Sequence, residues 1–264
     1  VRDSLLVENS GEDRIKEFIL YLNPGLIITG LTWENRDIPY QREGQACRVE
    51  LPVGKGEKIC LAMEYEGKID EKICYLDIDN DVYHDAFWGN SLMGYGRRNA
   101  LLEKDLTLLT PECLWYPVSF PPVFPGKSNM ANRMFTDYRL TVITAPGYTA
   151  ISQGEVFRKG DSILFENDHA LSGLSLCMGK YKNRTIALDS MDLDVFYFDE
   201  QSMLLRECDG DANAVSKGIQ AAWDYNVSAQ LIKYPFRRMK IIEVPVAFCS
   251  YLREWKEGSE FVQP

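Results

Sequence analysis

The amino-acid sequence predicts a mainly β protein, an antiparallel sandwich or saddle-shaped sheet followed by a short α/β segment. Three observations lead to this prediction. Short runs rich in β-branched and aromatic residues recur from residue 4 to about residue 198, turn signals separate them, and a helical period appears only afterwards. Strands that recur this often, with short connections, are typical of antiparallel sheets.

Composition supports a packed core and excludes some classes of function. Apolar residues make up 45% of the 264 residues and aromatic residues 12%, which is enough for a globular core. The 29 Lys and Arg residues against 39 Asp and Glu give a net charge of −10. Because nucleic acid requires a basic surface, we expect no nucleic-acid partner. No apolar run approaches the ~20 residues of a membrane-spanning helix, so we expect no direct membrane insertion by this segment.

The predicted strands are bounded by residues that favour turns. Residues 138–143 alternate polar and apolar side chains, as a strand with one solvent-exposed face does. Asn23-Pro24-Gly25 and Ala145-Pro146-Gly147 supply turn residues between such runs. Further strands are predicted at residues 14–22, 27–33, 47–51 and 58–65.

After Phe198 the pattern becomes helical. Asp209 or Asp211 can cap a helix that ends before Pro235, because proline disfavours the helical conformation of the preceding residue. Most of its apolar positions fall on one face: Ala212, Val215, Ile219, Ala222, Trp223, Asn226 and Ala229.

A strand at residues 239–244, stopped by Pro245, follows this helix. We therefore predict a β domain over residues 1–198 and the start of an α/β domain over residues 199–264. Within that second segment the strand has no predicted partner, so we expect it to lack sheet neighbours.

No metal site or catalytic residue can be assembled from the spacing of the reactive side chains. The two histidines, His84 and His169, lie far apart and neither begins H-E-x-x-H, whereas zinc sites need closely spaced ligands. The seven cysteines are scattered without a C-x-x-C pair, and we expect most of them to be small buried apolar side chains.

Two further patterns resemble functional motifs but fit ordinary structure better. Residues 173–177 resemble a nucleophile elbow without its final glycine, and a strand with alternating apolar residues is the better interpretation. The aromatic cluster around Trp115 and Tyr116 could form a carbohydrate-stacking face or pack in the core. We favour the core.

Three stretches follow one another in an order shared with one protein family. The first covers residues 20–28, 33–40 and 61–67, and the second runs from 114–117 through 135–154, similar to "W-x-P … F-x-L-x-V-x-x-P-x-x-x-x-x-S-x-G". The third, residues 234–245, is similar to "Y-P-F/Y-x-K-x-x-x-x-x-V-P". In this order they resemble the aminopeptidase N and leukotriene hydrolase family of zinc metallopeptidases, the gluzincins.

The resemblance implies an N-terminal β saddle over residues 1–198 and the truncated start of a thermolysin-like peptidase domain over residues 199–264. In the family the zinc-binding H-E-x-x-H helix comes later than the part that resembles this chain, and both ends of the sequence look cut. The resemblance thus implies a non-catalytic fragment that provides the scaffold and one wall of the substrate cleft. Zinc would then belong to the full-length parent, and the remainder of its peptidase-like domain would be the partner.

A second similarity is to bacterial proteins in which this fold is fused to a transporter-permease-like membrane region. It implies a membrane-anchored parent with this segment outside the bilayer. The alternative to a peptidase is a β-sandwich module that binds proteins or glycans in a degenerate, non-peptidase, membrane-associated parent. An H-E-x-x-H motif downstream of Pro264 would favour the enzyme.

One substrate-binding residue is implied within the chain. The family follows its V-P by a G-x-M-E-N loop, whose glutamate pairs with the free α-amino group of a peptide. Gly258-Ser259-Glu260-Phe261 is similar, which makes Glu260 the candidate for binding peptide amino termini. The match lies later than usual after Pro245 and lacks Met and Asn, so a solvated loop glutamate is the alternative. The saddle-domain glutamine that holds the amino group in the family has no convincing match here.

Overall fold

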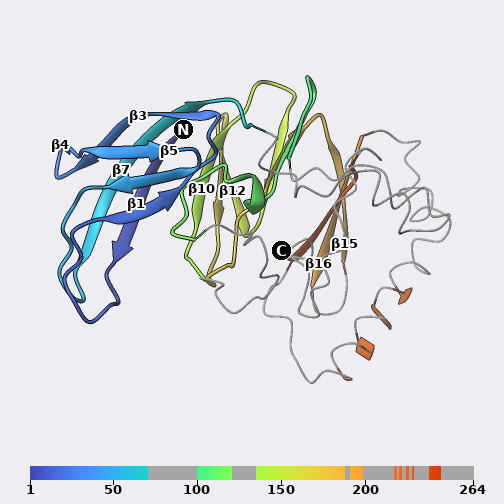
Figure 1. Cartoon of the computed structure of the whole chain (residues 1–264). Helices are drawn as coiled ribbons and strands as arrows, with labels where there is room; N and C mark the ends of the chain where they lie inside the picture. The colour runs from blue at the N-terminus through green and yellow to red at the C-terminus, as the bar shows by residue number, and fades with distance from the viewer. Residues whose placement is uncertain are drawn as a thin grey trace, which may run out of the picture. The chain divides into compact units, whose positions relative to one another are not determined.

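The computed structural model of the chain describes residues 1–70, 100–120, 135–187, 191–198 and 238–244, with some helical residues between 217 and 228. Contacts divide the chain into two compact units. Unit 1 consists of Val1–Leu101 with Leu109–Phe135, and unit 2 of Leu102–Leu108 with Thr136–Pro264. Strands dominate both, and antiparallel pairing prevails, which confirms the predicted fold class (Figure 1).

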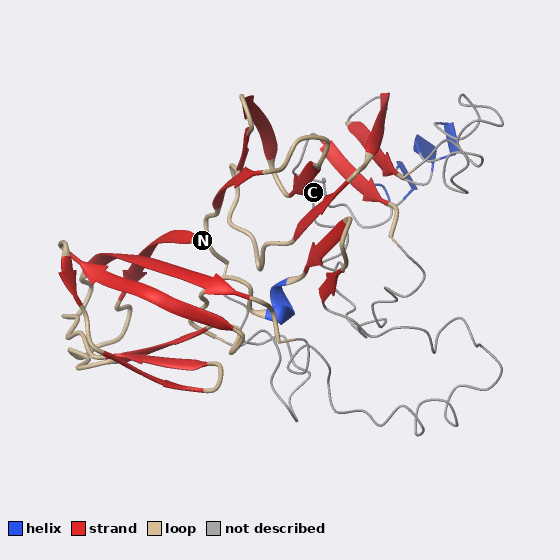
Figure 2. Ribbon diagram, turned by 90° about the horizontal axis from the view of Figure 1, so that it is seen from above, coloured by secondary structure: helices blue, strands red, loops and turns tan. Residues whose placement is uncertain are grey.

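Unit 1 contains two sheets that form separate layers (Figure 2). The four-stranded sheet has the order β1-β7-β3-β4 and the three-stranded sheet the order β2-β6-β5. Their strands are β1 (Arg2–Glu8), β2 (Phe18–Tyr21), β3 (Leu26–Trp33), β4 (Arg36–Asp37), β5 (Tyr40–Glu43), β6 (Ala46–Val49) and β7 (Lys58–Gly67). The strands predicted at 14–22, 27–33, 47–51 and 58–65 are thereby confirmed, with ends that differ by a few residues.

The core of unit 1 lies between these two layers. In β7 every second side chain, Ile59, Leu61, Met63 and Tyr65, is at most 3% exposed. They form one cluster with apolar residues of the opposite sheet, Leu20, Cys47 and Val49 among them. Burying one large apolar side chain stabilises a fold by about 1.5–3 kcal/mol. The alternation of β7 therefore fixes which face of its sheet meets the second layer.

Three smaller sheets, ordered β10-β13-β12, β11-β14-β9-β8 and β15-β16-β17, contain the strands of unit 2, and the boundary between the units falls within β8 and β9. A short 3₁₀ helix, η2 (Pro111–Cys113), follows β9 in the chain. The strands are β8 (Ala100–Leu102), β9 (Leu106–Leu109), β10 (Arg139–Ile143), β11 (Thr149–Ser152), β12 (Glu155–Lys159), β13 (Ser162–Glu166), β14 (Leu176–Gly179), β15 (Lys182–Ala187), β16 (Asp192–Tyr197) and β17 (Arg238–Ile242). The strand predicted at residues 138–143 corresponds to β10.

The strand predicted at residues 239–244 exists as β17, but the expectation that it lacks sheet neighbours is wrong. β17 pairs in parallel with β16, with Asp192 opposite Arg238 and Phe196 opposite Ile242. A parallel pair needs a long crossover connection, usually with a helix, and this one runs from residue 198 to residue 237. Local pattern reasoning could not reveal a partner across that distance. The domain boundary at residue 198 stays a prediction.

A helix occurs within this crossover, as predicted. The helical residues described are Lys217, Gly218, Gln220, Ala221, Asp224, Tyr225 and Ser228. Gln220 Nε2 donates to Asp224 Oδ1 at 2.9 Å, one turn further along. The predicted caps, Asp209 and Asp211, and the predicted apolar face lie outside the described residues.

Candidate functional site

Asn23, in unit 1, joins the first stretch that resembles the metallopeptidases to the beginning of the second. Its side chain is fully buried. Asn23 Nδ2 donates to Cys113 O at 2.8 Å and to Asp70 O at 3.2 Å, while Oδ1 accepts from Gly25 N at 2.9 Å and Asp70 N at 2.7 Å. Glycine is needed at position 25, because a Cβ there would lie 1.9 Å from Lys68 O. One amide thus fixes three segments that are distant in sequence.

Tyr65 makes a second connection between the same stretches. Its hydroxyl donates to Asp3 Oδ2 at 2.7 Å and lies 3.2 Å from Trp115 O. Burial raises the pKa of Asp3, and the hydrogen bond from Tyr65 opposes this rise. Trp115 and Tyr116 are 6% and 8% exposed, with their rings edge to face at 4.9 Å. These rings therefore pack in the core, as we favoured, and do not form a carbohydrate-stacking face.

Lys240, in unit 2, joins the end of the second stretch to the third. It lies on β17, and its Nζ donates to Ser152 O at 2.6 Å and to Gly154 O at 2.7 Å. Nζ also lies 5.5 Å from the centre of the Phe165 ring, within the range of a cation–π contact. We call Lys240, Phe165 and the turn Ser152-Gln153-Gly154 the Lys240 cluster.

The turn within the Lys240 cluster is held from its other side by residues before β14. Gln153 is buried, and its Oε1 accepts from Ser175 N at 2.9 Å. Ser152 Oγ donates to Ser175 O at 2.6 Å. Gly154 has a φ of 92°, and a Cβ there would lie 2.3 Å from Glu166 O. The S-x-G pattern of the resemblance therefore has a structural reason: only glycine fits the third position.

An ion pair with a buried carboxylate lies next to the Lys240 cluster. Asp194 is buried on β16, where its Oδ1 accepts from Thr185 Oγ1 at 2.6 Å. Its Oδ2 accepts from Arg238 Nη1 at 2.9 Å, and Arg238 stands where the family pattern has lysine. Burial lowers the pKa of Lys240 to about 8, while the charges of Asp194 and Glu155 oppose this shift.

The Lys240 cluster positions segments of the chain and does not present a reactive group. The Lys240 amine is directed at two main-chain carbonyls, so it ties a turn to a strand rather than serving as a nucleophile or base. Within the described ranges, no group of three His, Cys, Asp or Glu side chains lies close enough to hold a metal ion. His169 Nδ1 lies 2.8 Å from Oδ1 of its neighbour Asp168 at the surface. Among the residues that the structure describes, no helix is long and apolar enough to cross a bilayer.

The other sequence candidates have different outcomes. Glu260, the candidate for peptide amino termini, and His84 lie outside the described residues. Residues 173–177 run into strand β14, and Ser175 contributes its main chain to the Gln153 network. Three of the cysteines described are buried, Cys47, Cys113 and Cys177, whereas Cys60 is exposed.

Sequence reasoning missed Asn23, Tyr65 and Lys240 as the residues that join the stretches, and Asp194 as the partner of Arg238. A lysine between apolar residues in the run Met239-Lys240-Ile241 was the available signal, because a charged residue within a buried strand requires partners.

The fold, taken as a whole, is that of the N-terminal part of aminopeptidase-N-like zinc metallopeptidases. No family model matches the sequence, and no curated protein matches it. Among solved structures, the chain is similar to the M1 zinc metallopeptidase from Deinococcus radiodurans, with a TM-score of 0.59 and 13% identity over 91% of this chain and 51% of that one.

Two further structures show the same likeness. A mutant of a two-domain M1 zinc metallopeptidase bound to L-tryptophan has a TM-score of 0.60 and 13% identity, over 94% of this chain and 56% of that one. Legionella pneumophila aminopeptidase A in complex with aspartic acid has a TM-score of 0.58 and 11% identity, over 87% and 25%. This chain spans about half the length of the two M1 zinc metallopeptidase structures. At these identities the likeness establishes the fold alone.

Proposed function

We propose that this chain is the scaffold of a zinc aminopeptidase-like protein and forms one wall of its substrate cleft, without supplying catalytic residues. The observation that carries the proposal is the Lys240 cluster. It ties the turn at residues 152–154 to β17, the strand that leads into the segment containing Glu260. The likeness to about half the length of M1 zinc metallopeptidases supports the same conclusion.

Glu243, the residue that follows β17, is held by two hydrogen bonds. Tyr181 Oη donates to Glu243 O at 2.8 Å, and Phe198 N donates to Glu243 Oε2 at 2.8 Å. Rigid placement matters in such a role, because a misplacement of about 1 Å can cost a hundredfold in rate. In this proposal Glu260 pairs with the protonated amino terminus of a peptide, which orients the substrate and restricts cleavage to its first residue.

The described part of this chain contains no suitable set of zinc ligands. In the proposal, a zinc ion of the parent is therefore held by other residues. A zinc ion in such an enzyme polarises the scissile carbonyl and activates a water molecule. In the proposal this chain's part is to bind and orient the peptide. The remainder of the peptidase-like domain is the partner of this chain. A membrane anchor elsewhere in the parent is compatible with the proposal.

The test is the Glu260→Gln substitution in the full-length parent, assayed on a peptide with a free amino terminus. Loss of a hydrogen bond to a charged group costs about 1.5–3 kcal/mol, so we expect kcat/KM to fall about 10- to 100-fold. Glu257→Gln, three positions earlier in the sequence, is the matched control and should leave kcat/KM unchanged. An N-acetylated substrate should be equally poor for all three proteins, because it lacks the charged amine.

Two results would count against the proposal in different ways. Unaltered kinetics of Glu260→Gln would remove the role of Glu260 and leave the scaffold intact. A parent without H-E-x-x-H and without peptidase activity would instead favour the binding module. The burial of Trp115 and Tyr116 weakens the glycan form of that alternative.

A further inference from the structure

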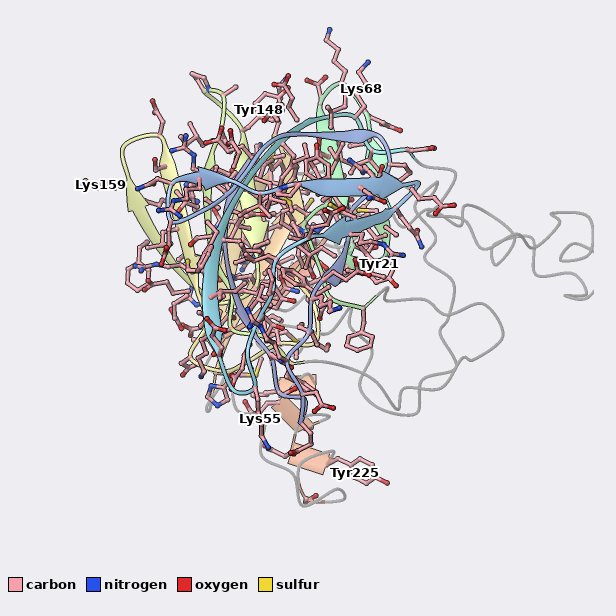
Figure 3. The ribbon with its side chains drawn as sticks, turned by 60° about the vertical axis from the view of Figure 1, so that its left-hand side comes forward. Tyr21, Lys55, Lys68, Tyr148, Lys159 and Tyr225 are labelled. Atoms are coloured by element: carbon pink, nitrogen blue, oxygen red, sulfur yellow. The ribbon has the colours of Figure 1, made fainter. Side chains whose placement is uncertain are left out.

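Strand β12 forms an open edge of the sheet β10-β13-β12. All five residues from Glu155 to Lys159 are exposed, and within the described part of the chain no strand lies on the outer side of β12. Lys159 lies at the rim of the drawn molecule, next to the turn that leads into β13 (Figure 3). Unpaired edges of this kind present main-chain N–H and C=O groups to a possible partner strand.

The register of the hairpin decides which main-chain groups are available. Lys159 pairs with Ser162 across the two-residue turn Gly160-Asp161. Residues that flank such a turn exchange both ladder hydrogen bonds, and pairing then alternates along the strand. The N–H and C=O groups of Val156 and Arg158 therefore face the open edge.

The charges along β12 are complementary to those of a second copy of the strand that runs in the opposite direction. Glu155, Phe157 and Lys159 alternate with Val156 and Arg158, so they share one face of the sheet. If two β12 strands pair antiparallel with Phe157 at the centre, Glu155 of each copy faces Lys159 of the other. The same register places Val156 opposite Arg158 of the second copy, where both residues offer their free main-chain groups.

The face that carries these charges also has an apolar centre. Phe157 is 53% exposed and lies directly opposite Leu164 on the neighbouring strand. An ion pair of 2.5 Å between Arg139 and Glu166 borders this group. An apolar centre with a charged rim is the usual composition of an interface.

We propose that β12 is the interface of a weak two-fold dimer of this chain, formed by antiparallel pairing of two β12 strands about Phe157. Lysine on an edge strand usually prevents such pairing by repulsion between like charges. Here the position opposite Lys159 is a glutamate, so the same lysine attracts the second copy. The dimer does not depend on the proposed peptidase scaffold.

Sedimentation velocity of the full chain, in reducing buffer from micromolar to about 1 mM protein, tests the proposal. We expect a reversible monomer–dimer equilibrium that weakens with salt, because exposed ion pairs are screened. Lys159→Glu and Glu155→Lys each place like charges opposite one another, and each should raise the dimer dissociation constant about tenfold or more. An equimolar mixture of the two variants restores both attractive pairs and should dimerise. Lys16→Glu, an equal charge change on an exposed residue of unit 1, should have no effect.

Phe157→Lys is a second variant, and it places two lysines opposite each other at the centre of the proposed dimer. Unlike Glu155→Lys, it leaves in place the charge of Glu155, which acts on Arg238 and Lys240. Circular dichroism and thermal unfolding show whether each variant is folded. A wild-type chain that stays monomeric at the highest concentration overturns the proposal. So does a dimer that is unaffected by both Lys159→Glu and Phe157→Lys, or a mixture of folded charge variants that fails to associate.

Discussion

Lys240 gives the stability of unit 2 a defined pH dependence, which replacement by methionine should remove. The charged groups that face Lys240 are Asp194 and Glu155, which raise its pKa, and Arg238, which lowers it. Burial is the largest influence and brings the pKa of Lys240 from 10.5 down to about 8. In the unfolded chain the amine returns to its ordinary value, so between these two pH values the unfolded state binds more protons than the folded state.

The sign follows from that difference in bound protons. Stability rises with pH wherever the unfolded state binds more protons, so the contribution of Lys240 to the free energy of unfolding increases from about pH 8 to pH 10.5. One pKa unit corresponds to 1.36 kcal/mol, so the increase is on the order of 3 kcal/mol. Below pH 8 the contribution is constant, because the amine is charged in both states.

Urea unfolding of the wild-type chain and Lys240→Met at several pH values from 7 to 10.5 measures this contribution. The difference between the two free energies of unfolding cancels the titration of groups that both proteins share. Lys16→Met, the same substitution at an exposed position, is the control. A flat or falling difference for Lys240→Met would refute the burial of Lys240 between β17 and the turn at residues 152–154.

Two further substitutions test the close contacts of Gly154 and Asn23 by their effect on stability alone. Gly154→Ala should destabilise the chain by more than about 2 kcal/mol, because φ is 92° and the Cβ would meet Glu166 O. Gly147→Ala is the matched control, because φ is 82° there but nothing lies near the added Cβ, and it should cost only about 1 kcal/mol. Equal costs for the two substitutions would contradict the close approach of residue 154 to Glu166 O. Asn23→Ala should cost about 2–5 kcal/mol because it removes the four hydrogen bonds that this fully buried amide makes to Gly25, Asp70 and Cys113. A cost below 1 kcal/mol, measured by urea unfolding, would mean that water replaces the amide.

The parts of the fold that sequence could predict are those set by local pattern. The β-branched and aromatic residues between turn signals at residues 58–65 predicted the strand β7, and the structure adds that every second side chain of this strand is buried. The turn residues at Asn23-Pro24-Gly25 predicted a chain reversal, although the hydrogen bonds of Asn23 to Asp70 and Cys113 depend on tertiary contacts.

The parts that could not be predicted join residues far apart in the chain. Lys240 meets Ser152 and Gly154 across 88 and 86 positions, and no periodicity encodes such a contact. For the same reason the parallel partner of β17 was missed, because its crossover carries no signal of where the strand returns. Glu260 was proposed from a resemblance, and it stays a prediction.

The central claim is that this chain is the non-catalytic scaffold of a zinc aminopeptidase-like parent, and the zinc content of the two proteins tests it most directly. Elemental analysis of the chelator-free parent should find zinc in a one-to-one ratio, together with aminopeptidase activity that is lost when the metal is removed. The chain of residues 1–264 alone should hold no stoichiometric zinc, because its two histidines are isolated in sequence. Tightly bound zinc in this chain, or a parent without zinc or peptidase activity, would contradict the account.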